Sequence, residues 1–355
     1  MQGEPQSYDR VLSSMCTPPH PDAAAAAVQF LSTNPGDPAT FPTIANLEHS
    51  VVDTLGDITG LSDPSGYVAS GGTEANIQAV HIARNNSRVE SPNIVVPASG
   101  HFSFRKAAEL LDVEYREASL DPAGRSEPES MKEIIDERTV LVVGVAGSTE
   151  RGCVDPIPAI ADIASDRDCL CHVDAAWGGF LLPFTDFSWN FADASIDMLS
   201  IDPHKCGRAA IPSGGFLVRN AALLDTISID TPYLHTEQQS TLGGTRSGAG
   251  VASAAAALEA LWPDGYEHQF RKASQQAAWL QTTLESMDIP AKSPDLPIVT
   301  APISDRAFST LRDAGWRLSR TASGDLRVVC MPHVTQSMLE AFVADLDRAV
   351  LSQAI

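Results

Sequence analysis

The chain has 355 residues, 43% of them hydrophobic and 19% charged, a balance typical of a globular protein with one large core or two lobes. Its net charge of −21 disfavours nucleic acid and anionic membranes as partners, and its apolar runs are far shorter than the roughly 20 residues of a membrane helix. The first thirty residues show no basic start followed by an apolar core, so we expect a cytoplasmic protein without a signal peptide.

The charge and the cysteines describe the compartment further. An excess of 45 Asp and Glu over 24 Lys and Arg suits a protein kept soluble in concentrated salt, where screening shortens electrostatic interactions. We interpret it as an adaptation of the whole surface to a salt-rich cytoplasm. The six cysteines include no CxxC pair, so we expect free thiols and no metal site.

The first fifty residues are rich in proline, and an Ala-rich stretch at 23–31 has helical character. Such a segment either wraps over a neighbouring subunit or forms a loosely packed terminus. Apolar residues with a helical period follow at 46–59.

Residues 66–76 read Gly-Tyr-Val-Ala-Ser-Gly-Gly-Thr-Glu-Ala-Asn, which predicts a short strand that turns through glycines into a helix. We expect Ser70 or Thr73 to cap this helix. Glycines before a helix start allow backbone N–H groups to converge on an anion, and the helix dipole adds a favourable field. Gly71, Gly72 and Thr73 are therefore candidates for a phosphate cradle; the alternative is an ordinary Gly-rich turn.

Strands and helices alternate from there to residue 218. Strand character is found at 94–97, 113–116, 139–145, 169–174, 198–201 and 215–218, and helical character at 101–111, 130–136 and 157–165. This alternation predicts an α/β fold with a mainly parallel central sheet flanked by helices. Because ligands of such sheets bind at the carboxyl ends of the strands, the residues that follow each strand are candidate site residues.

Lys205 comes just after the predicted strand 198–201, behind an Asp-Pro break and beside His204. The chain has only five lysines, and a charge at the end of a buried strand is costly unless it is paired or neutralised. Desolvation lowers the pKa of a lysine and makes its amine a nucleophile able to form a Schiff base. We hypothesise that Lys205 holds an aldehyde cofactor, pyridoxal phosphate; the alternative is a lysine that caps strand-end carbonyls.

Asp174 ends the predicted strand 169–174 among apolar neighbours, so its carboxylate needs a partner. The protonated pyridine nitrogen of pyridoxal phosphate would supply one, and the pair keeps the ring an electron sink. Ala175 and Ala176 leave room for a flat ring against the backbone. The alternative is an aspartate that caps the following turn.

The C-terminal third begins with a second Gly-rich turn at 240–250 and two helical stretches, up to about 262 and at 266–287. Strand and helix then alternate at 298–303, 307–314, 326–330 and 336–350, the outline of a small α+β lobe. We divide the chain into an N-terminal segment at 1–50, a large α/β domain at 51–240 and a small C-terminal α+β domain at 241–355.

The order and spacing of these motifs resemble fold type I enzymes that use pyridoxal phosphate. The narrower resemblance is to the group II pyridoxal-phosphate-dependent amino-acid decarboxylases, through Gly71-Gly-Thr-Glu-Ala-Asn76, His101, His172-Val-Asp-Ala-Ala-Trp-Gly-Gly179 and Asp202-Pro-His-Lys205. The compact archaeal tyrosine/aspartate decarboxylase branch is similar at Cys16-Thr-Pro-Pro-His-Pro21, Gly244-Thr-Arg-Ser-Gly248 and Arg327-Val-Val-Cys-Met-Pro-His-Val-Thr335. The resemblance covers residues 9 to 350, about the whole chain.

The resemblance implies a role for each matching residue. Lys205 forms the Schiff base, Asp174 pairs with the pyridine nitrogen and His101 stacks on the ring. It also implies that Gly72, Thr73 and His204 contact the phosphate and that His172 lies near the ring. The family's sites lie at a homodimer interface, so Gly244 and Thr245 of the partner subunit are expected to add phosphate contacts.

On the substrate side, Arg327 resembles the arginine that binds the α-carboxylate, although a lone arginine on a strand is by default a surface residue. The residue that protonates the product stays open: Tyr233 does not align securely with the family's loop tyrosine, and His20 and His235 are further candidates.

The branch includes tyrosine, aspartate and glutamate decarboxylases. We expect aspartate, converted to β-alanine and CO2 for coenzyme A supply, because salt-adapted members would need that precursor. An acidic protein must attract this dianion with local cations, and Arg208, Arg246 and Arg327 are candidates. Another reaction on the same fold, by a lyase, desulfurase or aminotransferase, is the alternative, and a scaffold without activity is a second one.

Overall fold

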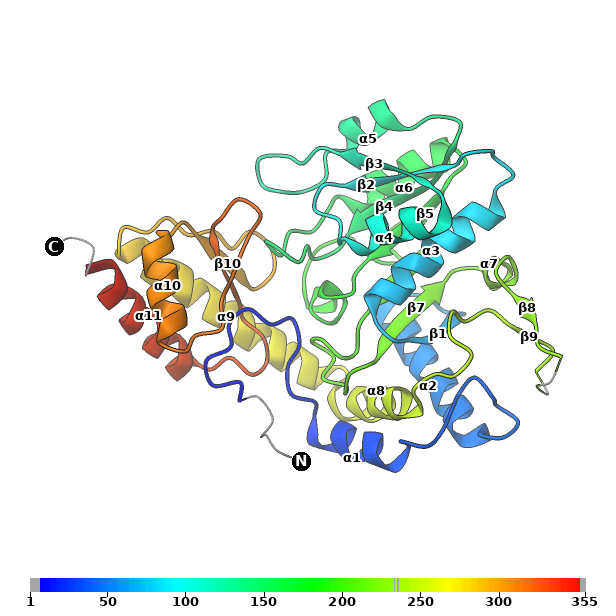
Figure 1. Ribbon diagram of the computed structural model, residues 1–355, viewed down its shortest axis with the longest axis horizontal. Coiled ribbons are helices and arrows are strands. Elements are labelled where there is room, and N and C mark those ends of the chain that lie inside the picture. Colours follow the sequence, from blue (N-terminus) through cyan, green and yellow to red (C-terminus); the bar gives the residue numbers. More distant parts are fainter. Residues whose placement is uncertain (1–6, 233, 235, 352–355) are drawn as a thin grey trace. The chain divides into compact units, whose positions relative to one another are not determined.

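The computed structural model describes residues 7–232, 234 and 236–351, and it divides into two compact units (Figure 1). The larger unit comprises residues 19–148 and 153–266, and the smaller unit comprises the described residues of 1–18, 149–152 and 267–355. The chain changes unit after Tyr266, whereas the boundary expected from the sequence lies near residue 240. The reason is that the Ala-rich helix α8 (Gly248–Leu261) packs against α1 (Pro21–Gln29) and α2 (Pro42–Thr59) of the larger unit.

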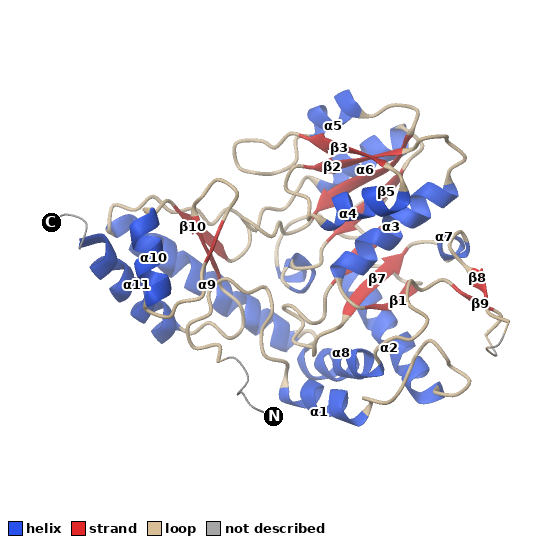
Figure 2. Ribbon diagram, in the orientation of Figure 1, coloured by secondary structure: helices blue, strands red, loops and turns tan. Residues whose placement is uncertain are grey.

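A seven-stranded sheet forms the centre of the larger unit, with the strand order β1-β7-β6-β5-β4-β2-β3 (Figure 2). Its strands are β1 (Ser65–Ala69), β2 (Asn93–Pro97), β3 (Glu114–Ala118), β4 (Thr139–Val145), β5 (Leu170–Asp174), β6 (Met198–Ile201) and β7 (Gly214–Val218). Strand β7 pairs antiparallel with both of its neighbours, and the other pairings are parallel. The predicted α/β fold with a mainly parallel sheet is confirmed.

Helices cover both faces of this sheet. They are α3 (Gly72–Asn86), α4 (Ser103–Leu111), α5 (Pro128–Ile134), α6 (Ile157–Asp166) and the one-turn α7 (Ala222–Asp225), with the 3-10 turns Gly178–Phe180 and Leu182–Phe184. Alternation along β4 shows why two layers form: Val143 belongs to the core cluster under α3, whereas a Cβ on Gly144 would meet Ile157 of α6 at 2.6 Å. The larger unit is therefore a three-layer α/β structure.

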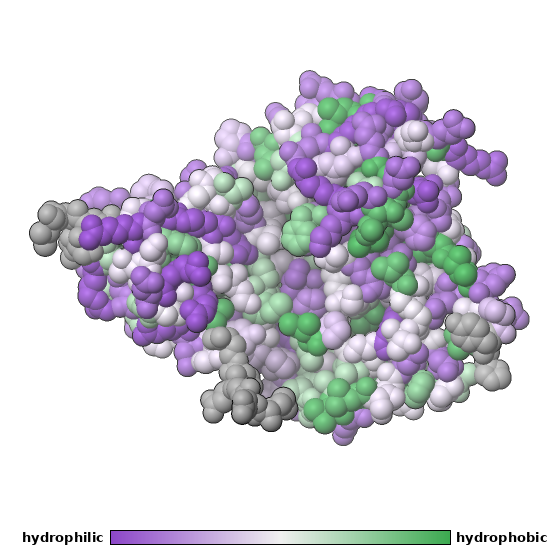
Figure 3. All heavy atoms as spheres, in the orientation of Figure 1, coloured by the Kyte–Doolittle hydropathy of each residue, from purple (hydrophilic) through white to green (hydrophobic). Residues whose placement is uncertain are grey.

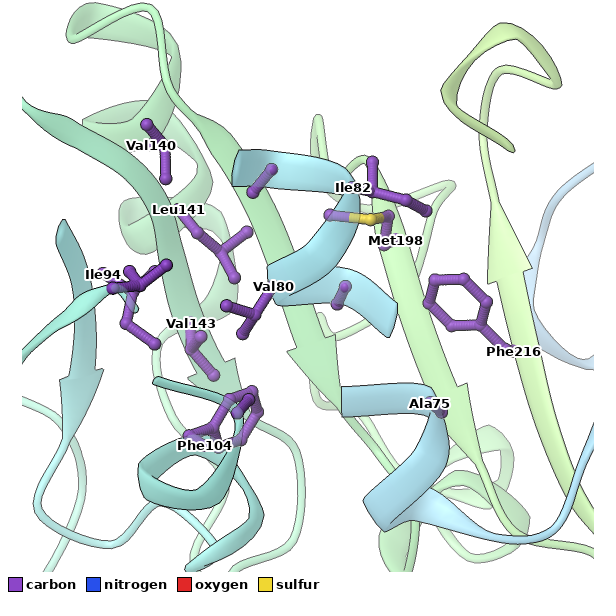
Figure 4. Packing of buried hydrophobic residues seen from close by; sticks show 14 of the residues in the cluster. Ala75, Val80, Ile82, Ile94, Phe104, Val140, Leu141, Val143, Met198 and Phe216 are labelled. Atoms are coloured by element: carbon purple, nitrogen blue, oxygen red, sulfur yellow. The ribbon is translucent and has the colours of Figure 1, made fainter. Parts of the chain in front are cut away.

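A cluster of apolar side chains packs between α3 and the sheet. Val80 of α3 lies beside Leu141 and Val143 of β4, and Ile82 of the same helix lies beside Met198 of β6 (Figure 4). These side chains are fully buried. Burying side chains of this size contributes about 1.5–3 kcal/mol each, so this face fixes α3, and with it the residues at its N-terminus.

The smaller unit has a three-stranded antiparallel sheet of order β10-β12-β11. Its elements are β10 (Ile298–Ala301), α10 (Asp305–Asp313), β11 (Ser319–Arg320), β12 (Leu326–Val329) and α11 (Gln336–Leu351), and α9 (Asp264–Ser286) enters it from the larger unit. Trp316 and Phe342 pack edge to face with their ring centroids 5.2 Å apart. This is the α+β arrangement that the alternation at 298–350 predicts.

A short hairpin, β8 (Ile229–Asp230) with β9 (Gln238–Gln239), completes the described elements. Hydrophilic side chains cover much of the face shown in Figure 3, as the acidic composition leads one to expect. None of the described helices is long and apolar enough to cross a membrane.

Candidate active site

The candidate site lies at the carboxyl edge of the central sheet. Strands β5 and β6 are parallel neighbours with Asp174 opposite Ser200, so Asp174 and Asp202 both leave the sheet at the same edge. Strand β1 ends beside them, because Ala69 pairs with Gly214 and Gly215 pairs with Ile201.

The turn from β1 into α3 is closely packed. Gly71 has a φ of +154°, which favours glycine, and a Cβ on it would meet His204 Cε1 at 3.0 Å. A Cβ on Gly72 would meet the Cβ of Ala176 at 2.8 Å and Asp202 Oδ2 at 3.1 Å. The turn therefore brings Gly71, Gly72, Ala176 and His204 together, as a phosphate cradle requires.

The predicted cap of α3 is wrong. The N-cap position is Gly71, and no side chain caps it; instead, the backbone N–H of Ser70 donates to Glu74 Oε2 at 2.8 Å. The reason is that Glu74 reaches back across the turn and takes the Ser70 amide, so neither hydroxyl is used. The first N–H groups of α3 are left without a side-chain cap, which suits an anion.

Lys205 is paired with a buried carboxylate. Its Nζ lies 3.0 Å from Asp202 Oδ2, and Asp202 is 1% exposed. Asp202 Oδ1 is buried and has no hydrogen-bond partner among the described residues. His204 Nδ1 lies 2.5 Å from Ser213 O, so it donates there, and its Nε2 lies 3.8 Å from Asp202 Oδ2.

Asp174 is held by neutral donors on both oxygens. Asn76 Nδ2 donates to Oδ2 at 2.8 Å, while the Ser200 hydroxyl (3.2 Å) and the Ala176 N–H (3.1 Å) donate to Oδ1. The contact with Ala176 is the turn cap that was the alternative interpretation of this residue. The same buried carboxylate thus caps the turn and lies at the end of β5.

Two histidines complete this region. His172 is fully buried, with Nε2 2.9 Å from Asn76 Oδ1, and the partly buried His101 has Nδ1 3.0 Å from the Ser103 hydroxyl. Burial lowers the pKa of both His172 and His101, and the nearby Asp174 opposes the shift. The charges of Lys205 and Asp202 also act on the pKa of His101, the lysine lowering it and the aspartate raising it.

These residues fit pyridoxal phosphate. The uncapped start of α3 suits its phosphate, and the buried Asp174 carboxylate, with both oxygens held by hydrogen bonds, suits a protonated ring nitrogen. Asp202 has a buried oxygen with no partner among the described residues and an ion pair to the amine that would receive the aldehyde. The structure brings together Gly71, Gly72, Thr73, His101, His172, Asp174, Ala176, His204 and Lys205 in the larger unit.

The second Gly-rich turn lies over the α2 side of the same unit. Thr245 lines a cavity of about 210 Å³ with Ser70 and Glu74, and the Gly244 carbonyl accepts from Gln239 Nε2 at 3.5 Å. Arg246, expected as a cation for the substrate, is instead neutralised by Glu48, with Nη2 2.8 Å from Oε2. Because Glu48 belongs to α2, this ion pair links the second Gly-rich turn to that helix.

Arg327 is buried in the smaller unit rather than on the surface, since it is only 6% exposed. Its Nε donates to Thr149 O at 2.7 Å, and Nη1 donates to Ser13 O and to the Ser319 hydroxyl. Nη2 is buried and has no hydrogen-bond partner among the residues described. Burial lowers the pKa of Arg327 to about 10, so the group stays charged at neutral pH.

The His20 side chain caps α1, since its Nδ1 accepts from the Asp22 backbone N–H at 3.4 Å. The backbone N–H of His20 donates to the Arg208 carbonyl at 2.8 Å. Tyr233 and His235 lie outside the described residues.

Sequence reasoning missed Asn76 and Ser103 as members of this site. Asn76 lies one helical turn after Gly72 and is 1% exposed, and the polar Ser103, at the start of α4, is fully buried. A polar side chain on an apolar helix face, four residues from a phosphate-cradle glycine, is the signal that could have found Asn76.

Comparisons with known proteins agree with this site. Residues 29–286 match the pyridoxal-dependent decarboxylase conserved domain. A probable L-aspartate decarboxylase of Haloarcula marismortui is 59% identical over 98% of this chain and 99% of its own length. A probable L-tyrosine/L-aspartate decarboxylase of Methanoculleus marisnigri is 45% identical over 97% of this chain and 93% of its own.

In fold, a sphingosine-1-phosphate lyase of Burkholderia pseudomallei matches 96% of this chain and 85% of its own with a TM-score of 0.88 at 24% identity. The motif resemblance is thereby confirmed together with the fold. The chain belongs to the pyridoxal-dependent decarboxylase family, its cofactor is pyridoxal phosphate, and it is an amino-acid decarboxylase.

Proposed function

We propose that this enzyme converts L-aspartate to β-alanine and CO2. The observation that carries the proposal is the 59% identity, over nearly the full length of both chains, to a relative named probable L-aspartate decarboxylase. The Methanoculleus relative, named for both tyrosine and aspartate, is 45% identical, so tyrosine is the second candidate.

We assign the cofactor contacts to the larger unit. Lys205 binds the aldehyde through its amine, and the start of α3 with His204 holds the phosphate. Asp174 would hold the protonated ring nitrogen, because this carboxylate is buried and hydrogen bonds already orient both of its oxygens. When bound, the cofactor supplies an electron sink for the electron pair that remains as CO2 leaves.

The buried surroundings support this assignment. His172, Asp174, Ala176 and Asp202 are each less than a tenth exposed. Water is largely excluded there, so fixed charges act more strongly than they would in solvent. His101, neutral because burial lowers its pKa, presents an uncharged ring as a stacking surface.

Arg327 is assigned to a substrate carboxylate. No carboxylate lies within ion-pair distance of it among the described residues, and the three groups that accept its hydrogen bonds are uncharged. Its buried Nη2 therefore still has a donor to offer. A guanidinium fixed in this way suits a carboxylate oxygen, with a charge-assisted hydrogen bond as the gain.

The remaining assignments concern the partner subunit and the cell. We propose a homodimer in which Gly244 and Thr245 of one chain reach the phosphate of the other, and in which Tyr233 or His20 contacts the substrate. The −21 charge supports a salt-rich cytoplasm, where β-alanine would feed coenzyme A synthesis.

The test is CO2 release by purified, cofactor-loaded protein in high salt, with aspartate, tyrosine and glutamate offered separately. We expect CO2 and β-alanine from aspartate, with at most about a hundredth of that kcat/KM for the other two. Tyrosine lacks the side-chain carboxylate that aspartate offers to a cation, and glutamate is longer than aspartate by one methylene. Tyramine as the main product would move the substrate to tyrosine. A keto acid without CO2 would instead indicate an aminotransferase.

A further inference from the structure

Asn76 touches both Asp174 and His172, and a third contact leads from it to His101. It lies on α3 and is 1% exposed, and both N–H groups of its amide and its carbonyl oxygen form hydrogen bonds. Its Oδ1 faces His172, while its Nδ2 faces Asp174 at 2.8 Å and the Ser103 hydroxyl at 3.0 Å.

The hydrogen bonds of Asp174 determine which way this amide points. Both of its oxygens accept from N–H or O–H groups, so the atom of Asn76 that faces Asp174 is the NH2 group. The carbonyl oxygen then faces His172 Nε2 at 2.9 Å, which favours the proton on Nε2, while the Met198 backbone is a second hydrogen-bonding group that competes for a proton of this ring. A flip of the amide would place oxygen against oxygen at Asp174 and lose both contacts.

The same orientation reaches His101 through Ser103. The second N–H of Asn76 donates to the Ser103 hydroxyl oxygen, so that hydroxyl directs its own hydrogen to His101 Nδ1 at 3.0 Å. The Ser103 backbone N–H points at the same nitrogen, at 3.3 Å. His101 Nδ1 is therefore an acceptor, and the neutral ring carries its proton on Nε2.

We propose that Asn76 is a positioning residue that fixes the hydrogen-bonding pattern of the cofactor site: Asp174 as an acceptor on both oxygens, with His172 and His101 both as Nε2–H tautomers. The proposal rests on the roles proposed above for Asp174 and His101. It goes beyond them because one amide sets three side chains at once. Asn76 itself acts through these neighbours.

The chain offers a matched control in Asn93. This asparagine of β2 is also fully buried, and it bridges Asp136 (Nδ2 to Oδ1, 2.7 Å) and the Thr139 hydroxyl (2.7 Å to Oδ1) at the opposite edge of the sheet. Asn76→Leu and Asn93→Leu both delete buried hydrogen bonds and add the same bulk at a buried position, so we expect both to lower Tm. Only the first should disturb the cofactor site.

The first experiment uses unmodified, cofactor-free protein with 15N-labelled histidines. We expect the signal of His172, identified by its loss in His172→Gln, to show the Nε2–H tautomer at about pH 7.5, well above the ordinary histidine pKa. An Nδ1–H tautomer would overturn the proposal without any Asn76 variant having to fold. This result is independent of which amino acid the enzyme decarboxylates.

The second experiment compares the variants. Asn76→Leu should lose the single His172 tautomer and bind pyridoxal phosphate roughly tenfold more weakly, because Asp174 and His172 each lose a buried partner. Asn93→Leu should keep the wild-type tautomer and cofactor Kd. Equal cofactor Kd and His172 spectra in both variants would reduce Asn76 to a structural residue and refute the proposal.

Discussion

Asp174 and Asp202 are two buried aspartates at the ends of neighbouring strands, yet they are held in opposite ways. Asp174 receives hydrogen bonds from three neutral donors, whereas Asp202 has an ion pair with Lys205 on one oxygen and no partner on the other among the described residues. The first arrangement is complete before any ligand binds. The arrangement at Asp202 depends on the amine of Lys205, which the cofactor would occupy. The ion pair of Asp202 must therefore change when the cofactor binds.

The largest effect is expected for Lys205→Ala, which removes the partner of Asp202 and the covalent attachment of the cofactor. The kcat should fall by roughly 10⁴-fold or more, as when a covalent catalyst is lost. Single-turnover CO2 release measures it, with Lys272→Ala as the control for loss of a lysine elsewhere. Activity within about tenfold of wild type would show that Lys205 does not hold the cofactor.

Asp174→Asn tests the other half of the comparison. The amide of this variant has the same shape as the carboxylate, and the Ser200 hydroxyl can still donate to its oxygen. Because the ring nitrogen of the cofactor would lose its anionic partner, kcat should fall by about 10²–10³-fold. Circular dichroism should stay unchanged while the rate drops. Near-normal turnover would mean that Asp174 serves only to cap the turn at Ala176.

Arg327 extends the comparison to the smaller unit, because it too keeps one buried polar atom without a partner among the described residues. Arg327→Lys keeps the positive charge but loses the planar guanidinium that can donate two parallel hydrogen bonds to a carboxylate. The KM for aspartate should therefore rise by about 10–100-fold at an unchanged cofactor Kd. The measurement is steady-state kinetics beside a cofactor titration. If the cofactor Kd rises in parallel, Arg327 is a structural residue.

Gly72→Ala probes the packing between Asp202 and the cradle. Its Cβ would come within 2.8 Å of the Ala176 Cβ, so the turn must shift, and the cofactor Kd should rise by about tenfold, equivalent to about 1.4 kcal/mol of overpacking. Gly243→Ala is the matched control, since its Cβ meets nothing closer than 3.6 Å. Equal Kd values for both variants would place the phosphate elsewhere.

The smallest effect is the pH dependence of folding stability that His172 causes. Burial lowers the pKa of His172 in the folded protein, so below its ordinary value of about 6.5 the unfolded chain binds the proton first. The stability is fully present above that pH and falls as the pH drops, by up to about 1.4 kcal/mol per unit. Denaturant titrations from about pH 7.5 to about pH 5, which span the ordinary histidine pKa, should show a shallower decline for His172→Gln. Parallel curves would mean that His172 is not the group responsible.

The fold and the chemically distinctive residues could be predicted from the sequence, because they depend on local pattern. Lys205 and Asp174 follow short apolar runs, and the carboxyl ends of parallel strands meet at one edge. What could not be predicted depends on contacts between distant segments. Arg246 pairs with Glu48 across 198 residues, and Asn76 meets Asp174 across 98.

The domain boundary and the cap of α3 show the same limit. The position of α8 depends on its packing against α1 and α2, which its composition does not encode. The cap of α3 depends on which side chain forms the hydrogen bond at the helix start. Glu74 accepts from the Ser70 amide, whereas the hydroxyls of Ser70 and Thr73, which also favour helix starts, do not cap the helix.

The most direct test of the central claim is to locate the cofactor. Borohydride reduction of the loaded protein fixes pyridoxal phosphate to the amine that holds it, and peptide mass spectrometry then identifies the site among the five lysines. We predict the added mass on Lys205, with Lys106, Lys132, Lys272 and Lys292 unmodified. A label on one of those four, or none on Lys205, would contradict the assignment of the active site to the carboxyl edge of the central sheet.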